Sequence, residues 1–105
     1  KQLNITIMTR DEERQILKDA VETFGIKNQL DMLQEECAEL IVAISHYKRD
    51  RLGSTINLSE EIADVHIMMN QIILATSLGV EFFKEQKLQR LKERIMKYKN
   101  QSSTE

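Results

Sequence analysis

The chain has 105 residues, of which 41% are hydrophobic and 30% are charged, which is typical of one folded globular domain rather than a disordered chain. The net charge of −2 gives no reason to expect a nucleic-acid partner. Cys37 is the only cysteine, so no intrachain disulfide forms and a reducing, cytoplasmic location is expected. The longest apolar stretch contains Asp64 and His66, so we expect no membrane span.

Three glycines and the absence of proline divide the chain into four predicted helices. Gly25, Gly53 and Gly79 each follow a segment with helical periodicity, where a left-handed residue commonly ends a helix. The predicted fold is therefore an all-α four-helix bundle, a single domain over residues 1–105. We expect an N-terminal arm over residues 1–8 and a disordered tail over residues 101–105.

The first two predicted helices span residues 10–24 and about 27–49. Thr9 and Glu12 have the spacing of a capping box at the start of the first helix. The second helix has an apolar stripe at the i, i+3, i+4, i+7 spacing, with Cys37 as a small buried member. The other members of this stripe are Leu30, Leu33, Leu40, Ile41, Ile44 and Tyr47.

The third predicted helix begins near Asn57 or Ser59, with Asn57 and Glu60 as its capping box. It is apolar on two sides, and such a helix is buried on two sides. A small domain has few elements to cover both, so we expect a second subunit there. The fourth predicted helix spans about 81–100 and carries a basic strip beside an apolar face that points to the core. The strip consists of Lys87, Arg90, Arg94 and Lys97.

Two pairs of acidic residues have the same spacing in the second and third predicted helices. Glu36 and Glu39 form one pair, and Glu61 and Asp64 form the other. Residues three apart on a helix point to one side. If the two helices are antiparallel neighbours, four carboxylates converge, and their repulsion is relieved by a cation. Oxygen ligands of this kind suit Mg²⁺ or Mn²⁺, and the basic strip could hold phosphates from the other side.

The order of these motifs resembles the MazG-like superfamily of all-α nucleotide pyrophosphohydrolases. That pattern is Glu-Glu-x-x-Glu, a spacer, and then Glu-x-x-Asp. Here it is present as Glu35-Glu36-Cys37-Ala38-Glu39 and, after 21 residues, Glu61-Ile62-Ala63-Asp64. The resemblance covers roughly residues 24–98.

The resemblance implies Mg²⁺-dependent cleavage of a nucleoside triphosphate into a monophosphate and pyrophosphate. With the expected second subunit, the predicted assembly is a homodimer or homotetramer. Glu35 would be a water-activating carboxylate. Leu91 departs from members that have asparagine next to the first basic position. The implied metal ligands are Glu36, Glu39, Glu61 and Asp64, and the implied phosphate- or nucleotide-binding residues are Lys87, Arg90, Arg94 and Gln29.

Three alternatives remain open from the sequence. The first is the same fold acting on phosphoribosyl-ATP. The second is a helical module that binds a nucleotide or a protein partner without turnover. The third is a ferritin-like di-iron protein, which is disfavoured because neither acidic pair has the Glu-x-x-His pattern of that class.

Overall fold

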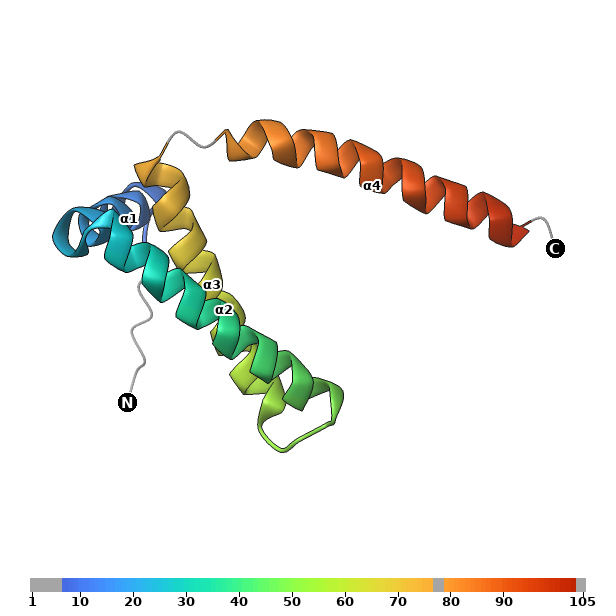
Figure 1. Cartoon of the computed structure of the whole chain (residues 1–105), viewed down its shortest axis with the longest axis horizontal. Helices are drawn as coiled ribbons and strands as arrows, with labels where there is room; N and C mark the ends of the chain where they lie inside the picture. Colours follow the sequence, from blue (N-terminus) through green and yellow to red (C-terminus); the bar gives the residue numbers. More distant parts are fainter. Residues whose placement is uncertain (1–6, 77–78, 104–105) are drawn as a thin grey trace.

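The computed structural model describes residues 7–76 and 79–103, and this part of the chain folds into four α-helices (Figure 1). The helices are α1 (Arg10–Phe24), α2 (Ile26–Lys48), α3 (Ser54–Ala75) and α4 (Val80–Ser103). None of these four helices has the length and apolar character needed to cross a membrane. The predicted all-α class is confirmed.

The start of α1 and its junction with α2 agree with the sequence. The backbone N–H of Glu12 donates to the Thr9 hydroxyl at 3.1 Å, and the Thr9 N–H donates to the Glu12 carboxylate at 3.3 Å. Gly25 alone separates α1 from α2, and its φ of +88° is readily adopted only by glycine. The capping box and the end of α1 are therefore confirmed.

The connection between α2 and α3 differs from the prediction. The left-handed residue after α2 is Asp50, with φ +53°, whereas Gly53 is the N-cap of α3, with φ +76°. Aspartate tolerates this region because its short polar side chain can hydrogen-bond locally. Helix α3 thus starts at Ser54, and the N–H of Asn57 already donates to the Gly53 carbonyl at 3.1 Å. The predicted capping box of Asn57 and Glu60 is wrong.

The predicted N-terminal arm and the predicted disordered tail differ in how well they agree with the structure. Helix α4 continues to Ser103, so the prediction of a disordered tail is wrong for residues 101–103. Ile7 and Met8 precede α1 without regular structure, in keeping with an arm. Residues 1–6 of the predicted arm and residues 104–105 of the predicted tail lie outside the described residues.

The core lies where α2 and α3 run side by side, with α1 packed across them (Figure 1). The buried apolar side chains are small or medium in size, and Ala43 of α2 is fully buried against α3. This close approach brings the backbones of α2 and α3 together along most of their length. The other buried apolar residues are Leu17, Val65, Met68 and Ile72.

Much of the predicted apolar surface stays exposed. On α2, Leu33 and Leu40 are only half-buried, and Cys37 is exposed, so its predicted burial is wrong. Helix α4 extends away from the other three helices (Figure 1), and Leu91 on its apolar face is 47% exposed. The predicted packing of this face into a core, and with it a complete four-helix bundle, is not present within one chain.

Candidate metal site

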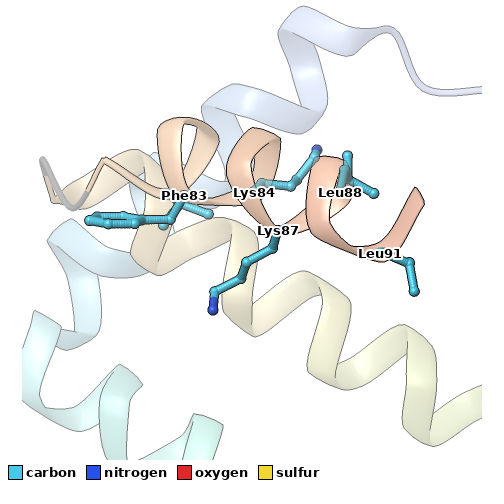
Figure 2. Close-up of a pocket in the computed structure, with 6 residues that line it drawn as sticks. Phe83, Lys84, Lys87, Leu88 and Leu91 are labelled. Atoms are coloured by element: carbon cyan, nitrogen blue, oxygen red, sulfur yellow. The ribbon is translucent and has the colours of Figure 1, made fainter. Parts of the chain in front are cut away.

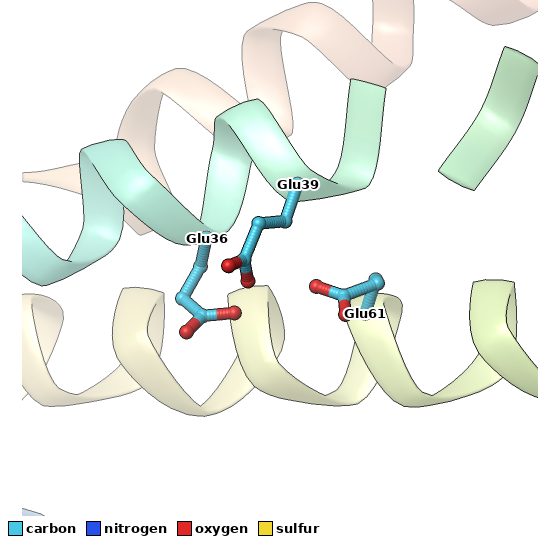
Figure 3. A group of neighbouring side chains, drawn as sticks. All are labelled: Glu36, Glu39 and Glu61. Atoms are coloured by element: carbon cyan, nitrogen blue, oxygen red, sulfur yellow. The ribbon is translucent and has the colours of Figure 1, made fainter. Parts of the chain in front are cut away.

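Three acidic side chains from α2 and α3 meet on one side of the helix pair (Figure 3). Glu36 and Glu39 lie one turn apart on α2, and Glu61 approaches them from α3. One oxygen from each carboxylate lies within 4.8 Å of the others. The structure therefore brings together three of the four acids predicted to bind metal.

Asp64, the fourth predicted ligand, lies beside this group rather than inside it. It is exposed on α3, three residues after Glu61. Its negative charge is near enough to raise the pKa of both Glu36 and Glu61. Asp64 is thus placed to extend the site by one carboxylate.

Two oxygens in the cluster are buried without a hydrogen-bond partner among the described residues. They are Oε2 of Glu36 and Oε2 of Glu61. A buried carboxylate oxygen that has lost its water without gaining a donor or a cation is unfavourable. These two oxygens, one from each helix, are the strongest structural indication that the site binds a proton or a cation.

The electrostatics of the cluster agree with this interpretation. Desolvation by burial, followed by the charges of Glu39 and Asp64, raises the pKa of Glu36 from 4.5 to about 7. Desolvation and the same two neighbours also raise the pKa of Glu61. The cluster therefore favours retaining a proton near neutral pH. A bound cation would neutralise the neighbouring negative charges and so remove a cause of the raised pKa.

The donor set fits a hard divalent cation. Mg²⁺ takes oxygen ligands at about 2.0–2.1 Å, so oxygens on opposite sides of one ion are about 4.2 Å apart. The separations of up to 4.8 Å among Glu36, Glu39 and Glu61 are close to this limit and can shorten by side-chain rotation. No histidine or cysteine belongs to the group, which favours Mg²⁺ or Mn²⁺ over softer metals.

A hollow of about 420 Å³ opens beside the acids. Glu39 and Glu61 line it together with Asn57, Ala38 and Val42. The sequence interpretation missed Asn57 as a site residue because it was assigned to a helix cap. Its position four residues before Glu61, and therefore on the same helix face, was the signal that could have found it.

Two other predicted site residues on α2 lie outside the cluster. Glu35 is exposed, about 100° around the helix from Glu36. Gln29 is buried between α2 and α3, where its Nε2 donates to Oε1 of Gln71 at 2.6 Å. This hydrogen bond places Gln29 in the packing between α2 and α3, and its nucleotide contact stays a prediction.

The basic residues lie on α4, away from the acids. Lys87, Arg90 and Arg94 are exposed and, with Leu91, line a separate hollow of about 430 Å³. Because α4 extends away from α2 and α3 (Figure 1), one chain does not bring the basic strip opposite the carboxylates.

In comparisons with known proteins, no family model, no curated protein and no solved structure matches this chain. The function is therefore inferred from the chemistry of the site and the arrangement of its motifs.

Proposed function

We propose that the chain is a Mg²⁺-dependent nucleoside triphosphate pyrophosphohydrolase, which converts a nucleoside triphosphate to its monophosphate and pyrophosphate. The observation that carries this proposal is the pair of buried, unpartnered oxygens of Glu36 and Glu61 inside a three-carboxylate cluster. The motif order shared with MazG-like enzymes supports the choice of substrate class.

Glu36, Glu39 and Glu61 would hold the ion, with Asp64 as a further ligand. Once bound, Mg²⁺ would supply positive charge for phosphate oxygens and polarise the reacting phosphorus. The chain itself contributes the hollow beside the acids. There the Asn57 amide can donate a hydrogen bond to a substrate oxygen, and Val42 provides an apolar wall.

The proposed water-activating carboxylate is Glu35. A general base has to come within hydrogen-bond distance of the water, directly or through one bridging water. Glu35 is exposed outside the three-carboxylate group but lies four residues before Glu39, on the same helix face, so the proposal requires it to reach the hollow when substrate binds. Glu35→Gln should then lower kcat while leaving Mg²⁺ binding unchanged.

The phosphate-binding side chains would come from α4. Lys87, Arg90 and Arg94 can stabilise negative charge on the leaving pyrophosphate. Since α4 does not reach the acids of its own chain, a homodimer or homotetramer is part of the proposal.

The direct test mixes the full chain with a panel of nucleoside and deoxynucleoside triphosphates plus Mg²⁺, and measures pyrophosphate. We expect Glu39→Gln and Asp64→Asn each to reduce the rate at least about 100-fold, because each removes charge that holds the ion. Glu22→Gln, the same chemical change on an exposed residue of α1, is the matched control and should keep full activity.

Two outcomes would contradict the proposal. The first is the absence of pyrophosphate from any nucleotide at high protein concentration. The second is full activity in the Glu39→Gln and Asp64→Asn variants, because that result would show that Glu39 and Asp64 are not metal ligands. Phosphoribosyl-ATP belongs in the panel, because turnover of that compound alone would narrow the substrate to one nucleotide.

A further inference from the structure

A surface with the composition of a small-molecule site lies on the first half of α4. It is a hollow of about 660 Å³, which is within the range of about 300–1,000 Å³ typical of ligand pockets. Four of its six lining side chains are apolar, and pockets of this composition bind the flat or apolar part of a ligand. This apolar hollow is lined by Val80, Phe83, Lys84, Lys87, Leu88 and Leu91 (Figure 2).

The apolar hollow adjoins the hollow of about 430 Å³ that holds the basic residues of the same helix. The basic hollow is lined by Lys87, Arg90, Leu91 and Arg94, so Lys87 and Leu91 belong to both. One end of the combined surface is therefore apolar and contains an aromatic ring, whereas the other end carries three cations. A ligand that fits both ends combines a flat group with a chain of negative charges, as a nucleotide does.

Phe83 is in register with the basic residues along α4. Phe83, Lys87, Arg90 and Arg94 follow one another at steps of four, three and four residues. At about 100° per residue they fall within an arc of about 60°, so they form one strip along the helix. Figure 2 shows the Phe83 ring near the start of α4 and Lys87 one turn further along. The order along this strip is an aromatic ring followed by three cations.

The Phe83 ring has a neighbour that holds it in place and a face that remains free. Its centroid lies 5.3 Å from that of Phe82, and the two ring planes make an angle of 79°, which is an edge-to-face contact. Phe82 covers at most one face of the Phe83 ring, and Phe83 is 54% exposed. A free aromatic face stacks on nucleobases of every kind, because every base has a π-face.

The cations that follow the ring are available to phosphates. Lys84 pairs with Glu81 at 3.5 Å, whereas Lys87, Arg90 and Arg94 have no ion-pair partner among the described residues. Like charges three or four residues apart on a helix repel each other. A chain of phosphates along this strip would relieve that repulsion and would begin one turn away from the aromatic ring.

We propose that Phe83 stacks on the base of the nucleotide whose phosphates contact Lys87, Arg90 and Arg94. This base contact rests on the proposed function, which brings the phosphates to the same strip. The site then accepts nucleotides with different bases, because the apolar hollow has little that distinguishes them. Its only polar side chains are Lys84 and Lys87, which donate hydrogen bonds but accept none.

Isothermal titration calorimetry of the full chain with Mg²⁺ tests the base contact. One probe is an ATP analogue with a methylene group between its α and β phosphorus atoms, which resists cleavage at the proposed bond. The other probe is inorganic tripolyphosphate, which has no base. Phe83→Ala should weaken binding of the analogue at least about 5-fold and leave tripolyphosphate binding unchanged, which also shows that the variant is folded.

Two further substitutions separate the base contact from the phosphate contacts. Arg90→Gln should weaken both probes alike, because both carry the phosphates. Phe24→Ala, the same change at a phenylalanine that is 58% exposed on α1, is the matched control for Phe83→Ala and should alter neither affinity.

Fluorescence gives a direct signature of stacking. The chain contains no tryptophan, so Phe83→Trp introduces a single indole at the site. This variant should keep its affinity for the ATP analogue, and its emission should be quenched by the analogue but not by tripolyphosphate. Phe24→Trp, which places the indole on α1, should show no quenching by either probe.

The tolerance for different bases is measured with the matching analogues of guanosine, cytidine and uridine. Their affinities should lie within about 100-fold of one another, because apolar contacts discriminate weakly between ligands. A site built to hydrogen-bond its substrate rejects analogues by about 10⁴-fold or more. A spread wider than about 100-fold would overturn the tolerance.

Three results would overturn the stacking of Phe83 on the base. They are no detectable binding of the ATP analogue to the wild-type chain, equal weakening of both probes by Phe83→Ala, and unchanged affinity of that variant for both probes. The fate of the enzymatic function is separate. Pyrophosphate release with unchanged analogue affinity in Phe83→Ala refutes stacking alone, whereas base-dependent binding without pyrophosphate release refutes hydrolysis alone.

Discussion

At the scale of single residues, the protein contains two contrasting groups of buried polar atoms. Gln29 and Gln71 satisfy each other across α2 and α3, and Nε2 of Gln71 also contacts the sulfur of Met68 at 3.4 Å. Oε2 of Glu36 and Oε2 of Glu61 lack any such donor among the described residues. The first group stabilises the helix pair by itself, whereas the second is stable only with a proton or a cation.

The free energy of unfolding without metal should fall as the pH rises from 5 to 8. Glu36 has a pKa raised from 4.5 to about 7, so the folded chain holds more protons than the unfolded chain between these values. The loss begins above about pH 4.5 and is complete above about pH 7. We expect a fall in Tm of about 5 °C, which corresponds to about 1 kcal/mol after allowance for solvent screening.

Thermal denaturation in EDTA at several pH values measures this effect. Addition of millimolar Mg²⁺ at pH 8 should restore most of the lost Tm, and Glu36→Gln should flatten the pH dependence. A metal-free Tm that rises steadily from pH 5 to pH 8 would show that the cluster does not retain its proton.

The glutamine pair should show strong non-additivity. Gln29→Leu or Gln71→Leu alone should lower the free energy of unfolding by about 1–3 kcal/mol, because the remaining amide is buried without its partner. The double substitution should lower it by less than the sum of the two. Urea denaturation measures all three variants, with Gln86→Leu on the exposed side of α4 as control. Additive losses would mean that the two amides do not depend on each other.

At the scale of secondary structure, the sequence predicted the four helices well. It predicted the N-cap of α1 but not the N-cap of α3. The start of α1 followed from Thr9 and Glu12, because a capping box is a local pattern that needs no tertiary information. The connection after α2 was mispredicted because two residues can adopt the left-handed region there. Asp50 takes that role, and Gly53 then starts α3 one turn earlier than Asn57 suggested.

This connection allows two substitutions with opposite expected signs. Gly53→Ala should lower the free energy of unfolding by about 1 kcal/mol, because a Cβ there meets nothing within 4 Å and only the φ of +76° opposes it. Asp50→Gly should raise it by up to about 1 kcal/mol, since glycine relieves the left-handed strain at φ +53°. Equilibrium denaturation of both variants checks the signs, and a stabilising Gly53→Ala would contradict the backbone argument.

At the scale of the whole molecule, the sequence identified the residues of the acidic site but not the position of α4. Glu36, Glu39 and Glu61 come from consecutive helices, so helical periodicity, together with the assumption that these helices are antiparallel neighbours, predicted their convergence. The predicted contact between the basic strip and the acids required the placement of α4, which depends on surfaces far apart in the sequence. The burial of Gln29 was not foreseen, because a polar residue in an apolar stripe can also be buried by pairing, here with Gln71.

The position of the three carboxylates on consecutive helices has a consequence for the order of folding. Glu36 and Glu61 are 25 residues apart, and the helices that carry them are joined by a short connection, so the acidic cluster needs only the packing of α2 against α3. Packing of two consecutive helices closes a shorter loop than contacts between distant parts of the chain, so it loses less chain entropy. Assembly of the proposed homodimer or homotetramer is instead an intermolecular event whose rate rises with protein concentration. Under the proposed function, a newly made chain would therefore be able to bind Mg²⁺ while still alone, before it meets a second copy.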